Sequence, residues 1–166
     1  MKKSITLFAL LTGLFSSLIA QEYQTAVGAR LGYPLSVSIK HFIKDSHALE
    51  AYVGTTGRFN SRFTNISVAY QIHKSLDDLN LLKGLNWYYG FGASAYFWNW
   101  RGSSSFYADR FNSISFGVQG YIGLDYKFED YPVNISMDWV PSLFINGFGS
   151  GFGSGFGAIA VRYTLK

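Results

Sequence analysis

Residues 114–128 read Ile114-Ser115-Phe116-Gly117-Val118-Gln119-Gly120-Tyr121-Ile122-Gly123-Leu124-Asp125-Tyr126-Lys127-Phe128, and this stretch decides the fold. Large apolar residues alternate along it with Ser, Gly, Gln, Tyr, Asp and Lys. A period of two predicts a β-strand, and this run is longer than the usual strand of a soluble sheet. Such a run is typical of a strand with lipid on one face and a narrow polar lumen on the other.

The same alternation recurs along most of the chain. We expect eight strands, at residues 24–33, 35–43, 48–57, 63–73, 85–98, 114–128, 133–144 and 158–165. Segments of about ten residues suit tilted strands that cross a hydrocarbon layer. Lipid offers no partner to an open sheet edge, so a sheet that spans a membrane has to close. The sequence therefore predicts an all-β protein, an eight-stranded antiparallel up-and-down transmembrane β-barrel.

The first twenty residues have the pattern of a secretory signal. Met1-Lys2-Lys3 is positive, residues 5–15 are mostly apolar, and small residues precede Gln21. The apolar run is shorter than the ~20 residues that a spanning helix needs. We therefore expect a signal peptide at 1–20 and a barrel domain at 21–166. Loss of Lys2 and Lys3 lowers the net charge from +4 to +2, and no basic tract suggests nucleic acid. The absence of cysteine excludes a lipoprotein anchor and disulfides.

Alternation alone does not say which face of the barrel is inside. A secreted lipocalin-like barrel would direct the apolar set into its core. Three features favour the membrane barrel instead. The polar face is rich in Gly, Ser and Ala, which suits the narrow lumen of eight strands. Charged residues make up 14% of the chain, fewer than a soluble surface carries. Aromatic residues reach 19% and gather near the strand ends, as in interfacial girdles.

Several segments resemble known outer-membrane barrels. They are residues 40–43 (Lys-His-Phe-Ile), 48–50 (Ala-Leu-Glu), 84–90 (Gly-Leu-Asn-Trp-Tyr-Tyr-Gly), 120–128, 132–139 (Pro-Val-Asn-Ile-Ser-Met-Asp-Trp) and 161–163 (Val-Arg-Tyr). With them the chain resembles the small OmpA/OmpX-like barrels, and most of all a group of uncharacterised barrels from Bacteroidetes-type, Gram-negative bacteria. The resemblance implies the fold and the outer membrane of the cell envelope, and it brings no activity. Such barrels usually end on an aromatic residue, whereas this chain ends Leu165-Lys166.

Charged residues on the polar face are expected to line the lumen. They are Arg30, Lys40, Glu50, Asp125, Lys127, Asp138 and Arg162. We expect Asp138 and Arg162 at similar heights on neighbouring strands, and Lys40 diagonally across a hairpin from Glu50. An unpaired charge is costly in so narrow a space, which favours a paired network that fills the barrel. The alternative is a path for protons or ions.

Two loops are predicted to make external contacts. The candidate contact residues are Phe106, Tyr107, Arg110, Phe148, Phe152 and Phe156. The last three belong to a Gly-Phe-Gly-Ser repeat at 147–157, which is too rich in glycine to favour a regular element. A drifting low-complexity loop is the alternative explanation of the repeat.

An enzymatic function has little support in the sequence. A lipid-modifying barrel enzyme could use His73-Lys74-Ser75, but we expect this triplet at the periplasmic mouth, away from outer-leaflet lipid. Metal-ligand spacing and phosphate-binding loops do not occur, so we predict no catalytic residue, no metal site and no cofactor.

The prediction is a non-enzymatic outer-membrane barrel with a filled polar lumen and a structural or surface-interaction role. Its termini are expected in the periplasm. Its expected partners are outer-membrane lipid, the barrel-assembly machinery and an extracellular ligand at the outer loops. A narrow channel for ions or small solutes is the main alternative.

Overall fold

The computed structural model describes residues 24–58, 61–76, 83–100, 114–146, 151–153 and 156–165. Every element in these ranges is a β-strand. The strands are β1 (Thr25–Tyr33), β2 (Leu35–Lys44), β3 (His47–Arg58), β4 (Ser61–Ser75), β5 (Leu85–Trp100), β6 (Ile114–Lys127), β7 (Val133–Trp139), β8 (Ser142–Phe144), β9 (Gly151–Gly153) and β10 (Gly157–Leu165). The expected signal peptide at 1–20 lies outside the described residues.

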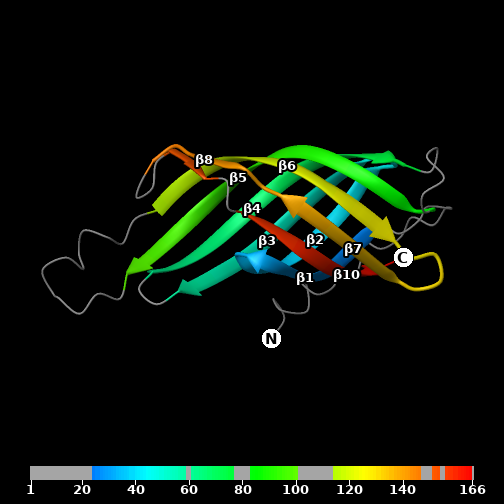
Figure 1. The fold of residues 1–166 in the computed structure, drawn as a ribbon, viewed down its shortest axis with the longest axis horizontal. Helices are drawn as coiled ribbons and strands as arrows, with labels where there is room; N and C mark the ends of the chain where they lie inside the picture. The colour runs from blue at the N-terminus through cyan, green and yellow to red at the C-terminus, as the bar shows by residue number, and fades with distance from the viewer. Residues whose placement is uncertain are drawn as a thin grey trace, which may run out of the picture.

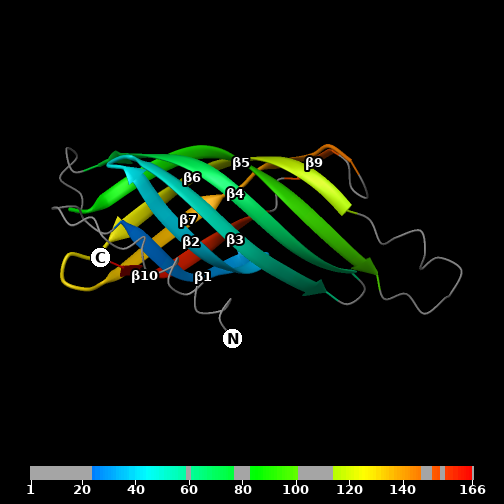
Figure 2. The ribbon, with the colours of Figure 1, turned by 180° about the vertical axis from the view of Figure 1, so that it is seen from behind.

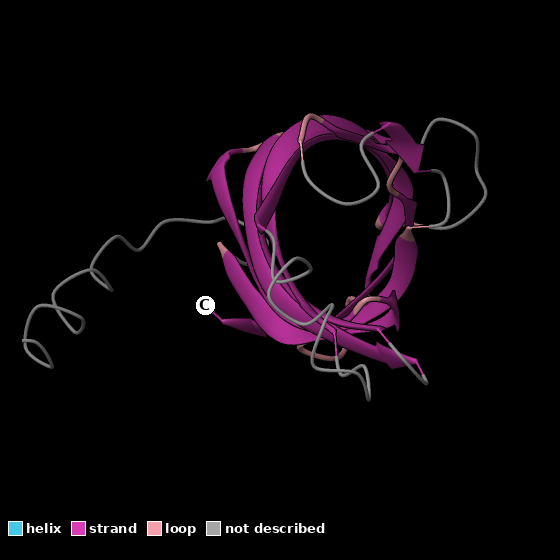
Figure 3. Cartoon of the chain, turned by 90° about the vertical axis from the view of Figure 1, so that its left-hand side faces the viewer, coloured by secondary structure: helices cyan, strands magenta, loops and turns pink. Residues whose placement is uncertain are grey.

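The strands form one closed antiparallel barrel. Each of β1 to β6 pairs with the next, β6 pairs with β7, and β10 lies between β7 and β1. Closure depends on the long register of β1 with β10, from Thr25 opposite Leu165 to Tyr33 opposite Gly157. Figure 1 shows the strands tilted across the long axis of the molecule, Figure 2 shows the same wall from behind, and Figure 3 shows the closed ring. The predicted eight-stranded antiparallel barrel is confirmed.

The ten β-segments form eight strands around the barrel, which we call staves. Two of the staves are interrupted, and each of these consists of two segments. Trp139 of β7 pairs with Ile122 and Ser142 of β8 pairs with Gln119, so β8 continues β7 along β6 in one register. Pro141 lies between the two segments, where its missing N–H favours a break in the strand. On the other side Trp139 faces Gly157 but Ser142 faces Gly153. Two residues separate Trp139 from Ser142 and three separate Gly153 from Gly157, so the eighth stave, β9 with β10, has one extra residue between these pairs.

The two ends of the barrel differ. The end that holds Thr25 and Leu165 is called the termini end, and the other the far end. Strands β3, β4 and β5 have 12, 15 and 16 residues, whereas β1 and β2 have 9 and 10. The wall is therefore taller at the far end on one side of the ring, where the green strands reach furthest in Figure 1.

The apolar face of every long strand points outward. In β6 the pattern alternates, with Phe116, Val118 and Ile122 about half exposed and Ser115, Gln119 and Asp125 buried. The same holds for β10, where Ile159 and Val161 are exposed and Arg162 is buried. The polar set thus fills the lumen, as the membrane interpretation requires and the lipocalin-like alternative does not. None of the described residues forms a helix long and apolar enough to cross a membrane.

Candidate functional site

Charged side chains meet in the middle of the lumen. Glu50 on β3 is fully buried, and its Oε1 accepts hydrogen bonds from Arg30 Nη1 of β1, at 2.9 Å, and from Arg162 Nη2 of β10. Its other oxygen accepts from Gln71 Nε2 of β4 at 2.7 Å. Arg30 continues across the lumen to Asp138 Oδ1 of β7 at 2.8 Å. The Glu50 carboxylate therefore links β3 to three other strands, β1, β4 and β10, and Arg30 extends the network to β7.

The remaining donors of Arg162 are also satisfied by strands on both sides. Its Nε donates to Ser38 Oγ at 3.0 Å, and its Nη1 donates to Ser136 Oγ at 2.7 Å and to Asn134 Oδ1 at 3.3 Å. The planar fork of arginine suits such multiple hydrogen bonding. Asp138 is satisfied in the same way, since Tyr88 donates its hydroxyl hydrogen to Asp138 Oδ2 at 2.8 Å.

A second group lies nearer the termini end. Lys40 Nζ is 2.8 Å from Asp125 Oδ2, and His73 Nε2 lies 3.3 Å from Lys40 Nζ and 3.8 Å from the same carboxylate oxygen. Asn134 Nδ2 donates to Asp125 Oδ1 at 2.6 Å, which links this group to Arg162. Lys40 Nζ also lies 4.6 Å from the centre of the Tyr88 ring, within the range of a cation–π contact.

The buried charges balance. Among the described residues, three basic side chains (Arg30, Lys40, Arg162) and three acidic ones (Glu50, Asp125, Asp138) are buried, and each forms an ion pair. Lys127, the seventh predicted lumen charge, is half-buried at the end of β6 opposite Asn134. Ion pairs with this many hydrogen bonds can hold charge in a low-dielectric interior, because most of the remaining donors find an oxygen; Arg30 Nε, which is buried without a hydrogen-bond partner among the described residues, is an exception.

Two expected pairings are wrong. Asp138 lies opposite Ala158 and Arg162 opposite Asn134, so Asp138 and Arg162 are separated along their strands. Lys40 lies directly opposite Glu50 rather than diagonally, and it bonds across the lumen to Asp125. The partners of these charges come from across the lumen, which a comparison of neighbouring strands does not reveal.

Hydroxyl and amide groups fill the next part of the lumen. Gln119 accepts from Tyr121 OH at 2.8 Å and donates to Tyr96 OH at 3.0 Å and to Ser142 Oγ at 3.2 Å. Tyr52 OH lies 3.0 Å from Tyr121 OH, and the Tyr52 ring stacks 4.6 Å from the Arg30 guanidinium carbon. This layer joins the ionic network to the far end.

Aromatic rings close the far mouth. Phe63, Tyr96 and Phe144 are buried and pack together, with ring centres 5.4 Å apart for Phe63 and Tyr96 and 5.0 Å apart for Tyr96 and Phe144. Trp98 and Phe156 complete the set, with Phe156 5.8 Å from Phe144. We call these five residues the mouth cluster. A cavity of about 10 Å³ lies beneath it beside Arg30, Tyr52 and Phe156, room for about one water molecule.

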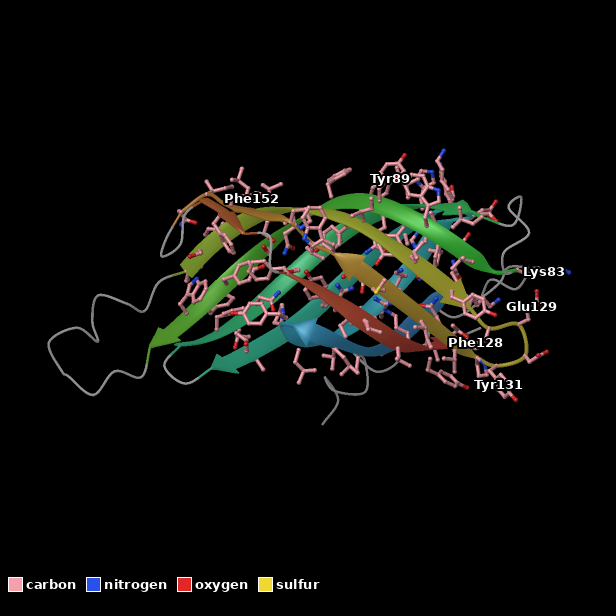
Figure 4. The ribbon with its side chains drawn as sticks, viewed as in Figure 1. Lys83, Tyr89, Phe128, Glu129, Tyr131 and Phe152 are labelled. Atoms are coloured by element: carbon pink, nitrogen blue, oxygen red, sulfur yellow. The ribbon has the colours of Figure 1, made fainter. Side chains whose placement is uncertain are left out.

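The residues predicted to make external contacts differ in where the structure places them. Phe152 is 70% exposed on β9 and stands outside the barrel, as Figure 4 shows at the upper left. Phe156 points into the mouth, although a spacing of four along a strand should keep both rings on one face. The extra residue between Phe152 and Phe156 turns Phe156 to the opposite face of the eighth stave. Phe156 is therefore a packing residue rather than an outer contact. Phe106, Tyr107, Arg110 and Phe148 lie outside the described residues.

The histidines have structural neighbours. His73, expected at the mouth of the barrel, is buried beside Lys40, Asp125 and the stacked Tyr88 ring at 4.9 Å, while Lys74 next to it faces outward. His41 Nδ1 lies 2.9 Å from Thr25 Oγ1, and His47 Nδ1 lies 2.5 Å from Tyr70 OH. Within the described ranges no group of His, Cys, Asp or Glu has the arrangement of a metal site.

Sequence reasoning missed the neutral partners in the network. They are Gln71, Tyr88 and Asn134, which are essentially fully buried. Each points into the lumen, like the predicted lumen charges on the same strand or on a neighbouring strand. Strand alternation could have found them, because bulky polar residues on a lumen face need hydrogen-bond partners.

The comparisons with known proteins found no matching family model, no similar curated protein and no similar solved structure.

Proposed function

We propose that this chain is a non-enzymatic integral outer-membrane barrel with a filled polar lumen, which serves the envelope as a structural element or through contacts of its outer loops. One observation carries the proposal: the outer wall is apolar all round, while charged side chains are buried inside. Val37, Phe91 and Met137 on three different strands are more than half exposed, and Glu50 and Lys40 are fully buried. In water such a wall would be an aggregation surface, whereas lipid is its matching solvent.

The proposed orientation places the termini end in the periplasm. An N-terminal secretory signal would deliver the chain to that side, and an even number of staves returns both termini there. The far end, with Phe152, the end of β5 at Trp100 and the start of β6 at Ile114, then faces outward and makes the contacts with an extracellular ligand. Outer-membrane lipid and the barrel-assembly machinery are the partners that a barrel of this kind requires.

Insertion is tested by refolding the chain with phospholipid vesicles and floating them through a density gradient. A barrel with this wall should float with the vesicles and resist extraction by alkaline carbonate. A chain that stays at the bottom of the gradient as a soluble monomer would contradict the proposal.

Conductance separates a filled lumen from a narrow channel. Because Arg30, Glu50 and Arg162 cross the lumen and the mouth cluster closes the far end, the wild-type barrel should be silent in a planar bilayer. We expect Arg162→Ala and Asp138→Ala to produce openings, since each removes a side chain that bridges the lumen. Steady conductance of the wild type would contradict the filled lumen and favour the channel.

A further inference from the structure

The outer wall carries a groove on β5, β6 and β7. It has a volume of about 410 Å³ and is lined by Trp87, Ile122, Leu124, Met137 and Trp139, together with the backbone at Gly123 and Asp138. The cross-strand register explains its shape. Trp87, Leu124 and Met137 form one row across the three strands, and Tyr89, Ile122 and Trp139 form the next. The two indoles therefore stand at diagonal corners, and shorter side chains make the floor between them.

The corner at Trp87 is held in place by its neighbour. The ring of Tyr89 lies 5.4 Å from that of Trp87 at an angle of 31°, so the two aromatic groups form one raised edge on β5. Tyr89 projects from the outer wall in Figure 4. Trp139, about half exposed on β7, makes the other edge. Neighbouring strands are about 4.8 Å apart, so the floor between the edges is roughly 10 Å wide, wide enough for a hydrocarbon chain.

A positive charge lies beside the groove at its termini end. Lys74 on β4 is exposed on the outer wall and is the cross-strand partner of Trp87. It is the residue before the last of β4, and Trp87 is the third of β5, so both lie close to the rim of the barrel. Lys83, also exposed, precedes β5 at the same rim and is labelled in Figure 4. One exposed acid, Asp45, lies near Lys74 in the turn between β2 and β3, next to Ser46, whose carbonyl oxygen accepts a hydrogen bond from His73 N at 2.7 Å. The exposed acids Glu129 and Asp130 are in the turn between β6 and β7.

We propose that this groove binds one phospholipid of the bilayer, with an acyl chain between Trp87 and Trp139 and the phosphate at Lys74. The inference rests on the proposed function, because it requires the wall to lie in a membrane. Tryptophan and lysine favour this arrangement, since both place an apolar body in hydrocarbon and a polar tip at the headgroups. In the proposed orientation the lipid belongs to the periplasmic leaflet. A three-strand floor is too small for a stable protein interface, which buries about 800 Å² on each partner.

Native mass spectrometry of the refolded barrel, released from detergent with dioleoyl phosphatidylglycerol as the probe, tests the site. We expect the wild type to retain one lipid, and Lys74→Gln to retain it about fivefold more weakly, the effect of about one lysine at a lipid surface. Trp87→Ala and Trp139→Ala should weaken it at least as much. Dioleoylglycerol, which lacks the phosphate, should bind the wild type and Lys74→Gln equally.

Matched controls come from the same wall. Phe91 is 65% exposed on β5 outside the groove, and Lys44 is exposed at the termini end on β2. Phe91→Ala and Lys44→Gln should retain the lipid as the wild type does. Equal losses in these controls, or equal retention in all variants, would overturn the proposed site. A mass of two chains that Trp139→Ala returns to one would also overturn it, in favour of an interface between copies.

Vesicle flotation, run on every variant, distinguishes this inference from the proposed function. If the wild type floats but the groove variants retain the lipid as well as the wild type does, only the lipid site is refuted. A wild type that does not float would refute both.

Discussion

Single residues in the lumen act through several partners, and Glu50 is an example. It accepts hydrogen bonds from Arg30, Arg162 and Gln71 while it is fully buried. Glu50→Gln would leave the buried guanidinium of Arg162 without its charge partner and that of Arg30 with Asp138 alone. We expect the free energy of unfolding to fall by about 3–5 kcal/mol, as when one member of a buried pair is removed. Urea titration of the vesicle-inserted barrel, followed by tryptophan fluorescence, measures this change.

An exposed acid provides the comparison at the same scale. Asp130 lies in the turn before β7 and is exposed. Asp130→Asn should change the free energy of unfolding by less than about 0.5 kcal/mol. Similar losses in Glu50→Gln and Asp130→Asn would mean that the lumen network adds little to stability.

Among the elements, the pairing of β1 with β10 closes the ring, and Gly28 lies at its centre. A Cβ atom at Gly28 would be 2.0 Å from the Val161 carbonyl oxygen and 2.5 Å from the Arg162 Cα. Both neighbours are backbone atoms, so Gly28→Ala has to push the two strands apart. We expect a loss of about 1–3 kcal/mol, typical of overpacking, and a smaller folded fraction after refolding. Heat-modifiable migration in gel electrophoresis measures that fraction.

Gly120 on β6 is the matched position, because a Cβ there would meet Pro141 Cγ at 3.4 Å and the Pro141 carbonyl oxygen at 4.0 Å, both ordinary contact distances. Gly120→Ala should refold as the wild type does. If Gly28→Ala also refolds fully, close approach of β1 and β10 is not needed for closure.

At the scale of the whole molecule, the two ends should face different compartments. The chain has no cysteine, so one introduced thiol reports its own position. Phe152→Cys is at the far end and Glu129→Cys at the termini end (Figure 4). In intact cells a membrane-impermeant maleimide should label Phe152→Cys, and it should label Glu129→Cys only after lysis. The opposite pattern would reverse the proposed orientation, and the wild type should remain unlabelled.

The sequence predicts the wall better than the contents of the barrel. Alternation in 114–128 locates β6 and its two faces, and the same pattern finds the long strands to within a few residues. It misses β9 (Gly151–Gly153), which lies in the repeat whose glycine content predicted no regular element. The partners of Arg162 could not be read in this way, because they depend on how far each strand is shifted around the ring. The facing of Phe156 depends on one extra residue in a glycine-rich segment, and glycine fits either register without leaving a signal.

The order in which the barrel can assemble follows from the distances between ion-pair partners along the chain. Arg30 and Asp138 are 108 residues apart, Arg162 and Glu50 are 112 apart, and Lys40 and Asp125 are 85 apart. None of these three pairs can form within one hairpin, whereas Arg30 and Glu50, 20 residues apart on β1 and β3, can meet before the ring closes. The long separations of the three pairs make the loop-closure cost high and the search slow. Full neutralisation of the interior is therefore coupled to closure of the ring. If the barrel lies in a membrane as proposed, we expect the chain to enter the hydrocarbon as a nearly complete barrel rather than hairpin by hairpin.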